Sequence, residues 1–305
     1  MLSIASTNKE KLQKFFNENI ESLSSLYPGL TFERLIREFE SSWSNGPVER
    51  REILKDCYLE GASHPLNTFF SQLKKGIPLE YISGLSYFYK SEFRVDQNVL
   101  IPRSETEILV EKAVEYLKSR AREAKKFSLV DIGTGSGNIL LSILQEVDTP
   151  CFAIGADISP SALSVARKNH FNLQHRMSRR HHIEWLLSDR FSNIHHEKDE
   201  LFDLIVSNPP YIKFQADRKL VHDKVDQTEP HSALYLKDED YDSWFALFFK
   251  QIEMNLKKGG MFIMEGHEHH LESLRLVASE VGLDLQSSHV LNDYTGRPRF
   301  FSWTK

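Results

Sequence analysis

The sequence FSLVDIGTGSGN, residues 127–138, decides the fold. Its first half, Phe127 to Ile132, is an apolar run typical of a strand that is buried on both faces of a sheet. Its second half places a glycine at every other position before a helical pattern begins at Asn138. Glycine permits a sharp turn and a close approach of the backbone to a ligand. A strand, a glycine turn and a helix in this order predict a sheet that binds its ligand beyond the strand ends.

The alternation of strand and helix continues after this stretch. We expect strands at residues 152–156, 183–187, 202–206 and 261–264, and helices from Pro160 to about residue 169 and at residues 244–256. A turn is expected at Gly259-Gly260. Continuous apolar strands between helices are typical of a parallel sheet covered on both faces. The expected fold class is therefore α/β, with a Rossmann-like sheet.

The N-terminal part of the chain has a different pattern. Apolar residues recur at helical spacing over residues 1–75, for example at Ile53, Leu54 and Tyr58, and proline and glycine separate the groups. This pattern predicts a small helical bundle. It contains no group of residues to which we can assign chemistry, so we expect it to serve in docking or packing.

A β-hairpin linker is expected between the bundle and the α/β domain. Residues 76–103 are rich in aromatic and β-branched residues and contain turn signals, as hairpins do. The α/β domain then spans residues 104–305. It should begin with a helix that runs to Arg120, in which Ser104 is the N-cap and Glu107 is its capping-box partner.

Composition sets broad limits on the class of protein. The chain has 305 residues, of which 40% are hydrophobic and 27% are charged, and its net charge is -5 with a pI of about 6.2. Nucleic-acid-binding proteins are usually basic, so we expect no direct DNA binding. We see no secretory signal and no apolar run of membrane-spanning length, so no membrane association is expected. Cys57 and Cys151 are far apart, which favours a reducing, cytoplasmic location.

Two carboxylates frame the glycine turn and suggest a nucleoside ligand. Asp131 stands two residues before Gly133, and Asp157, twenty residues after Gly137, ends the next strand, where carboxylates commonly accept hydrogen bonds from ribose hydroxyls. A dinucleotide site needs glycine at the position of Asn138. The ligand S-adenosylmethionine carries a positive sulfur and suits nearby carboxylates better than a pyrophosphate cradle does.

A third carboxylate follows the next strand. Asp189 is placed to accept from an adenine amino group, and we expect Phe191 to lie nearby as an apolar contact. Loops are often acidic, so a plain surface position for Asp189 is an equally good interpretation.

Residues 208–211, Asn-Pro-Pro-Tyr, leave an apolar strand and indicate methylation of an NH2 group on an sp² carbon. The two prolines fix their own φ angles and force Asn208 towards extended geometry, so the loop is stiff. The Asn208 side-chain oxygen and the Pro209 carbonyl can accept the two N–H bonds of a planar amide. These bonds strengthen as charge builds on nitrogen, which stabilises the transition state selectively. Tyr211 would pack on the planar group.

The chain resembles the HemK/PrmC family of protein-(glutamine-N5) methyltransferases over nearly its whole length. The matching segments are residues 78–84, 101–107, 131–137 and 207–212, together with Asp157, Glu229-Pro230, Ala233-Leu234 and Gly296-Arg297. The Asn-Pro-Pro-Tyr motif alone is shared with adenine-N6 DNA methyltransferases, whereas the segment at 101–107 and the hairpin are more specific. The chain departs from the family pattern at Ser104, at Arg190 and over residues 235–241.

The resemblance implies a class I methyltransferase that binds S-adenosylmethionine and acts on a protein. The implied substrate is the glutamine of the Gly-Gly-Gln motif of class I peptide chain release factors in translation termination, and the helical bundle would dock the release factor. The implied catalytic residues are Asn208, Pro209, Pro210 and Tyr211. The implied cofactor-binding residues are Asp131, Gly133, Thr134, Gly135, Ser136, Gly137, Asp157, Ile158, Asp189, Arg190 and Asn208.

Three alternatives remain open at this point. They are a methyltransferase for a ribosomal-protein glutamine, an adenine-N6 DNA methyltransferase, and a non-catalytic protein that binds a translation factor. Two further features are discounted: the basic, histidine-rich stretch at residues 167–182 is interpreted as solvated surface, and His267, His269 and His270 lack metalloprotease spacing and are interpreted as surface histidines at a helix start. No metal site is expected.

Overall fold

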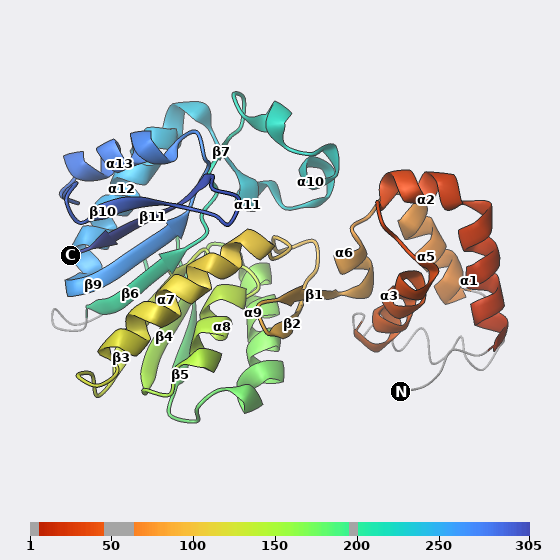
Figure 1. The fold of residues 1–305 in the computed structure, drawn as a ribbon, viewed down its shortest axis with the longest axis horizontal. Helices are drawn as coiled ribbons and strands as arrows, with labels where there is room; N and C mark the ends of the chain where they lie inside the picture. The colour runs from red at the N-terminus through yellow and green to blue at the C-terminus, as the bar shows by residue number, and fades with distance from the viewer. Residues whose placement is uncertain (1–5, 46–63, 195–200) are drawn as a thin grey trace. The chain divides into compact units, whose positions relative to one another are not determined.

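The computed structural model describes residues 6–45, 64–194 and 201–305 of the chain. Contacts divide the chain into two compact units (Figure 1). The first contains Met1–Ser86, Arg94–Gln97 and Asp223–Thr228, and the second contains Tyr87–Phe93, Asn98–His222 and Glu229–Lys305. The helical pattern around Ile53, Leu54 and Tyr58, and also Cys57, lie outside the described residues.

The first unit is helical. Its described helices are α1 (Ser6–Glu18), α2 (Ile20–Leu26), α3 (Phe32–Asn45), α5 (His64–Lys74), α6 (Leu79–Ser83) and α10 (Asp223–Thr228). Leu12, Leu35 and Leu73 are fully buried between them, as the helical spacing of apolar residues predicts. The Tyr27 hydroxyl donates to the carbonyls of Leu73 and Ile77 and so ties the end of α5 to this core.

Helix α6 corrects the expectation of β structure from residue 77 onward. Pro78 precedes the helix, where its missing N–H costs nothing, and Gly84 ends it at φ 75°. The β-branched Ile82 is buried in the core of the first unit, and this burial overrides its strand preference. The hairpin is therefore short, with strands β1 (Leu85–Phe88) and β2 (Ser91–Arg94).

The second unit is built on a seven-stranded sheet, in the order β10-β11-β9-β6-β3-β4-β5 (Figure 1). The strands are β3 (Phe127–Ile132), β4 (Cys151–Asp157), β5 (His182–Leu187), β6 (Phe202–Ser207), β9 (Leu256–Glu265), β10 (Ser288–Asn292) and β11 (Pro298–Thr304). Strands β5, β4, β3, β6 and β9 are parallel, whereas β11 runs antiparallel to both β9 and β10. The α/β class and the parallel sheet are confirmed.

Helices cover both faces of this sheet, and each face has its own core. The main helices are α7 (Glu107–Arg120), α8 (Asn138–Glu146), α9 (Pro160–Leu173), α12 (Tyr241–Asn255) and α13 (Leu271–Glu280). Helices α7 and α8 pack with Leu129 of β3 on one face. Helices α12 and α13 pack with the next residue, Val130, on the other. Adjacent strand residues point to opposite faces, so β3 carries apolar residues on both faces.

Short elements connect these layers. They are the 3-10 turns η1 (Ser104–Thr106), η2 (Gln174–Arg176), η3 (Arg218–Leu220) and η4 (Asp238–Asp240), the helix α11 (His231–Leu234), and the paired strands β7 (Ile212–Lys213) and β8 (Tyr235–Leu236). None of the described helices combines the length and apolarity needed to cross a membrane.

Two local expectations are wrong. Ser104 does not cap α7, because it begins a 3-10 turn and its hydroxyl donates to Glu105, while Glu107 accepts from the backbone N–H of Tyr89. Gly259-Gly260 does not form a turn before a separate strand. Both glycines lie within β9, where a register shift against β6 accommodates the φ of 75° at Gly259.

Candidate active site

The candidate site lies where the parallel strands of the second unit end. Ile132 of β3 pairs with Ala156 of β4 and with Ser207 of β6, and Ser207 pairs in turn with Met264 of β9. The four strands thus end at one edge of the sheet. The residues that follow them, beginning with the glycine turn and Asn208, gather there, as expected for a ligand site in such a fold.

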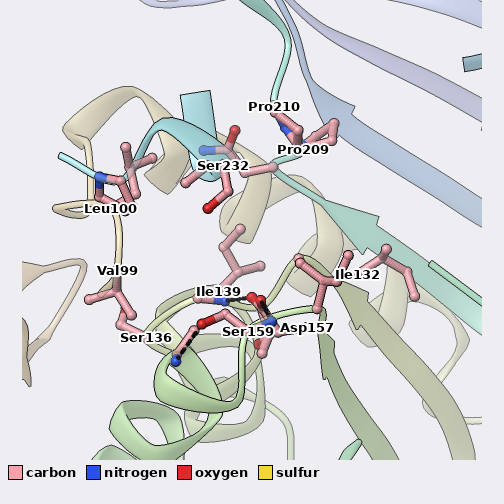
Figure 2. A pocket seen from close by; sticks show the side chains of 18 of the residues that line it. Val99, Leu100, Ile132, Ser136, Ile139, Asp157, Ser159, Pro209, Pro210 and Ser232 are labelled. Atoms are coloured by element: carbon pink, nitrogen blue, oxygen red, sulfur yellow. Dashed lines mark hydrogen bonds between the residues drawn. The ribbon is translucent and has the colours of Figure 1, made fainter. Parts of the chain in front are cut away.

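A cavity of about 340 Å³ opens at this edge, a volume in the range of small-molecule sites. Figure 2 shows Asp157 and Ser159 on one side of it and Pro209 and Pro210 on the opposite side. The cavity is also lined by the turn residues Gly133, Thr134, Gly135 and Ser136, and by Ile158, Asp189, Arg190, Asn208 and Trp244. The glycine turn and the Asn-Pro-Pro segment therefore face the same space.

The glycine turn adopts a conformation that other residues avoid. Gly133, Gly135 and Gly137 all have left-handed φ angles, of 73°, 55° and 78°. A Cβ atom on Gly137 would also lie 2.9 Å from Cη2 of Trp185. The backbone N–H groups of Gly133 and Thr134 donate to the carbonyl of Ala156, which fixes the turn on β4.

Asp157 is held in place by the turn that it faces. Its Oδ2 accepts from the N–H of Gly135 at 2.8 Å, and its Oδ1 accepts from the N–H of Ser159 at 2.9 Å. Burial raises the pKa of this carboxyl, and these backbone hydrogen bonds oppose the rise. Each oxygen has a second lone pair, so the carboxylate can also accept from hydroxyl groups of a ligand in the cavity.

Asp131 lies behind the turn and does not line the cavity. Its side chain is fully buried, and its Oδ2 accepts from the Thr134 hydroxyl at 2.7 Å. Burial raises the pKa of Asp131 to about 7. Asn169, which the sequence analysis did not single out, performs a similar role by donating to the carbonyl of Ser136. The side chains of Asp131 and Asn169 thus hold the glycine turn in place through hydrogen bonds.

Asp189 and Arg190 form an ion pair that lines the cavity. The guanidinium of Arg190 donates to both oxygens of Asp189, at 3.0 and 3.1 Å, and lies 5.0 Å above the ring of Trp244. Arg190 has a left-handed φ of 50°. Phe191 does not line the cavity, contrary to the expectation. It is buried in the core on the α12 face of the sheet.

The Asn208 side chain is oriented by a buried carboxylate at the end of β9. Its Nδ2 donates to Glu265 Oε2 at 3.2 Å and to Thr106 Oγ1 at 3.3 Å. Glu265 also accepts from the Thr106 hydroxyl at 2.5 Å and from the Tyr211 hydroxyl at 2.9 Å. Glu265 is 1% exposed, and burial raises its pKa. Neither Glu265 nor Thr106 is among the residues that the sequence predicts for the site.

Tyr211 has a contact that its motif did not predict. Its ring packs against the core on the α12 face, and its hydroxyl is bound to Glu265. Burial and the Glu265 charge raise the pKa of Tyr211 well above its ordinary value, so the phenol stays protonated and donates. The Tyr241 hydroxyl donates to the backbone carbonyl of Tyr211 at 3.1 Å, which fixes the end of the Asn-Pro-Pro-Tyr segment.

Comparisons with known proteins agree with this geometry. A family model described as a methyltransferase domain matches residues 123–290. A release factor glutamine methyltransferase of Leptospira interrogans is 34% identical over 277 residues, which cover 90% of this chain and 84% of that protein. One from Koribacter versatilis is 36% identical over 227 residues, which cover 73% of each chain. The chain belongs to the release factor glutamine methyltransferase family.

A solved structure supports the fold alone. The hMettl16 catalytic domain in complex with a 3'UTR hairpin has a TM-score of 0.51 and 12% identity, and the match covers 69% of this chain and 74% of that one.

The cofactor of this methyltransferase family is S-adenosylmethionine, and the residues present fit it. Asp157 offers carboxylate oxygens for ribose hydroxyls, and the glycine turn lets a ligand approach the backbone. Asp189 and Trp244 line the same cavity and offer a carboxylate that can accept from an adenine amino group and an aromatic ring that can stack on it.

The carboxylate of Glu229 links two segments that carry the family resemblance, residues 101–107 and Glu229-Pro230. Glu229 Oε1 accepts from Arg103 Nη2 at 2.5 Å, and its Oε2 accepts from the backbone N–H of Ile101 at 3.2 Å. The Glu229 side chain is 2% exposed, whereas that of Arg103 is 32% exposed and lines the cavity. The pair joins the segment before α7 to the segment before α11 beside the methyl-transfer site.

Most basic residues of the 167–182 stretch and His269 are exposed, as interpreted, whereas His181 and His270 are partly buried. His270 is partly buried, and its Nε2 lies 2.7 Å from Asp217 Oδ2. The Nε2–H of His181 donates to the carbonyls of Leu144 and Val147, and Arg180 donates to the carbonyl of Asp148. These residues hold loops of the methyltransferase unit together. Cys151 begins β4 as a buried apolar residue, as expected, and burial raises its pKa to about 12.

Proposed function

We propose that this chain transfers a methyl group from S-adenosylmethionine to the side-chain amide nitrogen (N5) of a glutamine in a class I peptide chain release factor. The observation that carries the proposal is the Asn208 side chain. Its Nδ2 is already bound to Glu265, so its Oδ1 is the atom available at the cavity to accept from an incoming amide. The names of the relatives specify the acceptor as a release factor glutamine.

Asn208 and Pro209 supply the chemistry expected of the protein. A primary amide nitrogen is a poor nucleophile because its lone pair is delocalised into the carbonyl. Two acceptors on its N–H bonds hold the nitrogen with its lone pair out of conjugation and gain strength as positive charge develops on it. The nitrogen gains the methyl group and loses one proton to water, so no strong base is needed at this site.

The glycine turn and the Asn-Pro-Pro segment lie next to each other, which suits a direct transfer of the methyl group. The backbone carbonyl of Asn208 is 3.9 Å from the position that a Cβ on Gly133 would occupy. When bound, S-adenosylmethionine supplies an electrophilic methyl group on its sulfonium. Asp157 and the glycine turn would hold the nucleoside, while the stiff Asn-Pro-Pro segment holds the amide nitrogen. Rigid positioning of both partners is the main source of rate.

The release factor as partner, and a cytoplasmic location beside it, belong to the same proposal. The Gly-Gly-Gln glutamine is the specific target that we propose, and the helical unit is the proposed docking domain. The acidic net charge of -5 supports a protein acceptor over DNA.

A single labelling experiment tests the proposed acceptor. The enzyme is incubated with S-adenosylmethionine labelled on the methyl group and, in separate reactions, a class I release factor, the same factor with its Gly-Gly-Gln glutamine changed to alanine, ribosomal proteins, and a DNA duplex. We expect label only on the unmodified release factor, and we expect Asn208→Ala to abolish it while cofactor binding persists. Label on the duplex or the ribosomal proteins alone would contradict the proposal.

A further inference from the structure

Glu265 is a buried carboxylate to which the reaction itself gives no role. It ends β9 at the same edge as the ends of β3, β4 and β6, and it is 1% exposed. Burial of a carboxylate is costly unless hydrogen bonds compensate. Three side chains donate to Glu265, and they come from two segments of the second unit: Thr106 before α7, and Asn208 and Tyr211 at the two ends of the proline segment after β6.

The contact with Asn208 is the one that bears on function. An ionised carboxylate can only accept hydrogen bonds, so it accommodates the NH2 end of the asparagine amide and rejects the oxygen end. If the amide turned over, Oδ1 would meet Oε2 of Glu265 at the distance now occupied by Nδ2, 3.2 Å. The amide is therefore held with its oxygen away from Glu265, and Asn208 lines the cavity.

We propose that Glu265 is a positioning residue that fixes the Asn208 amide with its oxygen towards the substrate amide nitrogen. This inference rests on the proposed function for the identity of the acceptor. Glu265 itself does not touch the substrate. Through Tyr211 it also anchors the other end of the Asn-Pro-Pro-Tyr segment, so one carboxylate sets both the orientation of the acceptor oxygen and the position of the loop that carries it.

The protonation state of Glu265 gives a readout that a purely structural role would not give. Burial raises the pKa of Glu265, while Thr106, Tyr211 and the charge of Arg299 lower it and the charge of Glu105 raises it. Protonated Glu265 can donate and would no longer reject the Asn208 oxygen. The Asn208 amide is therefore held in place above this raised pKa and is no longer held as the pH falls through it. We accordingly expect kcat to decrease at low pH, and this decrease is called the acid limb of the pH profile.

The test compares Glu265→Gln, Asn208→Asp and the double variant with the wild type. A misplacement of about 1 Å costs about 100-fold in rate, so we expect Glu265→Gln to lower kcat by roughly 10- to 100-fold with cofactor affinity unchanged. Its kcat should lack the acid limb, because nothing titrates at position 265.

Asn208→Asp alone places two carboxylates, the introduced one and that of Glu265, within contact distance, where they repel each other. Adding Glu265→Gln should restore activity above that of Asn208→Asp, because the amide at 265 can donate to Asp.

Thr106→Val provides a second variant that keeps the carboxylate. It removes a hydrogen bond that lowers the pKa of Glu265, so the acid limb should move to higher pH. The proposal would be overturned if Glu265→Gln kept full kcat and an unchanged acid limb. It would also be overturned if the double variant were no more active than Asn208→Asp, or if the acid limb of Thr106→Val stayed at the pH of the wild type.

One measurement does not depend on the acceptor. In the enzyme without substrate, the side-chain 15N–1H signals of Asn208 should shift with the titration of Glu265, and this titration should be absent from Glu265→Gln. Signals that do not titrate would overturn the positioning role. If the wild type fails to methylate a release factor while these signals titrate, the proposed function fails and the role of Glu265 stands.

Discussion

Three carboxylates shape the site at the scale of single residues, and each is bound by donors of the protein itself. Thr134 donates to Asp131, backbone N–H groups donate to Asp157, and Glu265 receives three side-chain donors. Donors that are already in place cost no reorganisation when a ligand binds. Asp131 and Glu265 thereby organise the groups that face the cavity, whereas Asp157 faces it directly.

Asp157→Ala should weaken cofactor binding without changing the acceptor side of the site. The variant removes the carboxylate for ribose hydroxyls and the anchor of the Gly135 N–H. A hydrogen bond to a charged group contributes about 1.5–3 kcal/mol, so the Kd should rise roughly 10- to 100-fold in isothermal titration calorimetry. Asn208→Ala keeps this carboxylate and is the comparison variant, and its Kd should rise less than that of Asp157→Ala. Equal Kd values for Asp157→Ala and wild type would remove Asp157 from the cofactor site.

At the scale of elements, the glycine turn shows most clearly how sequence sets local structure. Gly137 combines a left-handed φ of 78° with an approach to Trp185 that leaves no room for a methyl group. Gly296 has a similar φ of 84° but nothing within 4 Å of its Cβ position. Alanine variants at the two positions therefore distinguish the cost of the left-handed backbone from the cost of the contact with Trp185.

Gly137→Ala should lower the Tm more than Gly296→Ala does. A left-handed conformation costs a non-glycine residue about 1–2 kcal/mol, and only Gly137→Ala adds the contact with Trp185. Gly137→Ala should also weaken S-adenosylmethionine binding, whereas Gly296→Ala should not. Thermal unfolding and calorimetry measure both effects, and equal losses of Tm with unchanged binding in both variants would contradict this account of the turn.

Arg103 and Glu229 should contribute unequally to stability, although they form one pair. Arg103→Ala leaves Glu229 buried without its cation, which costs about 3–5 kcal/mol. Glu229→Ala leaves Arg103 partly exposed to water and a backbone N–H at Ile101 unpaired, which costs about 1–3 kcal/mol. Urea unfolding should therefore rank Arg103→Ala as the less stable variant. The reverse order would show that the buried carboxylate has other sufficient donors.

The sequence predicts elements well where one local rule dominates. The strands from 127 to 207, the helix opened by Pro160 and the glycine turn all follow from apolar runs and punctuation residues. Prediction fails where distant residues decide. Helix α6 forms because Ile82 is buried against the other helices, and β9 continues through two glycines because Lys305, next to β11, exchanges backbone hydrogen bonds with them. Neither neighbour can be identified from local spacing.

The residues of the candidate site are likewise predicted where a local rule applies and missed where distant residues decide. Asp157, Asn208 and the glycines stand directly after strands, and their positions follow from the rule that parallel strands end at one edge. Glu265 obeys the same rule, because it ends an apolar strand in Met264-Glu265-Gly266, and this signal could have identified it. Thr106 and Asn169 carry no such signal. Their roles come from side-chain contacts between residues more than thirty positions apart.

At the scale of the whole molecule, the two units have separate tasks in the proposed function. The described lining of the cavity, the three carboxylates and the Asn-Pro-Pro-Tyr segment all belong to the second unit. The first unit has its own helical core, and none of its described residues lines the cavity. We propose that it selects the release factor, while the second unit performs the methyl transfer.

Tandem mass spectrometry of a class I release factor after incubation with the enzyme and S-adenosylmethionine tests the central claim most directly. Wild-type enzyme should add one methyl group to the side-chain nitrogen of the Gly-Gly-Gln glutamine, and Asn208→Ala should leave that residue unmodified. A methyl group on any other residue, or the same modification by Asn208→Ala, would contradict the account.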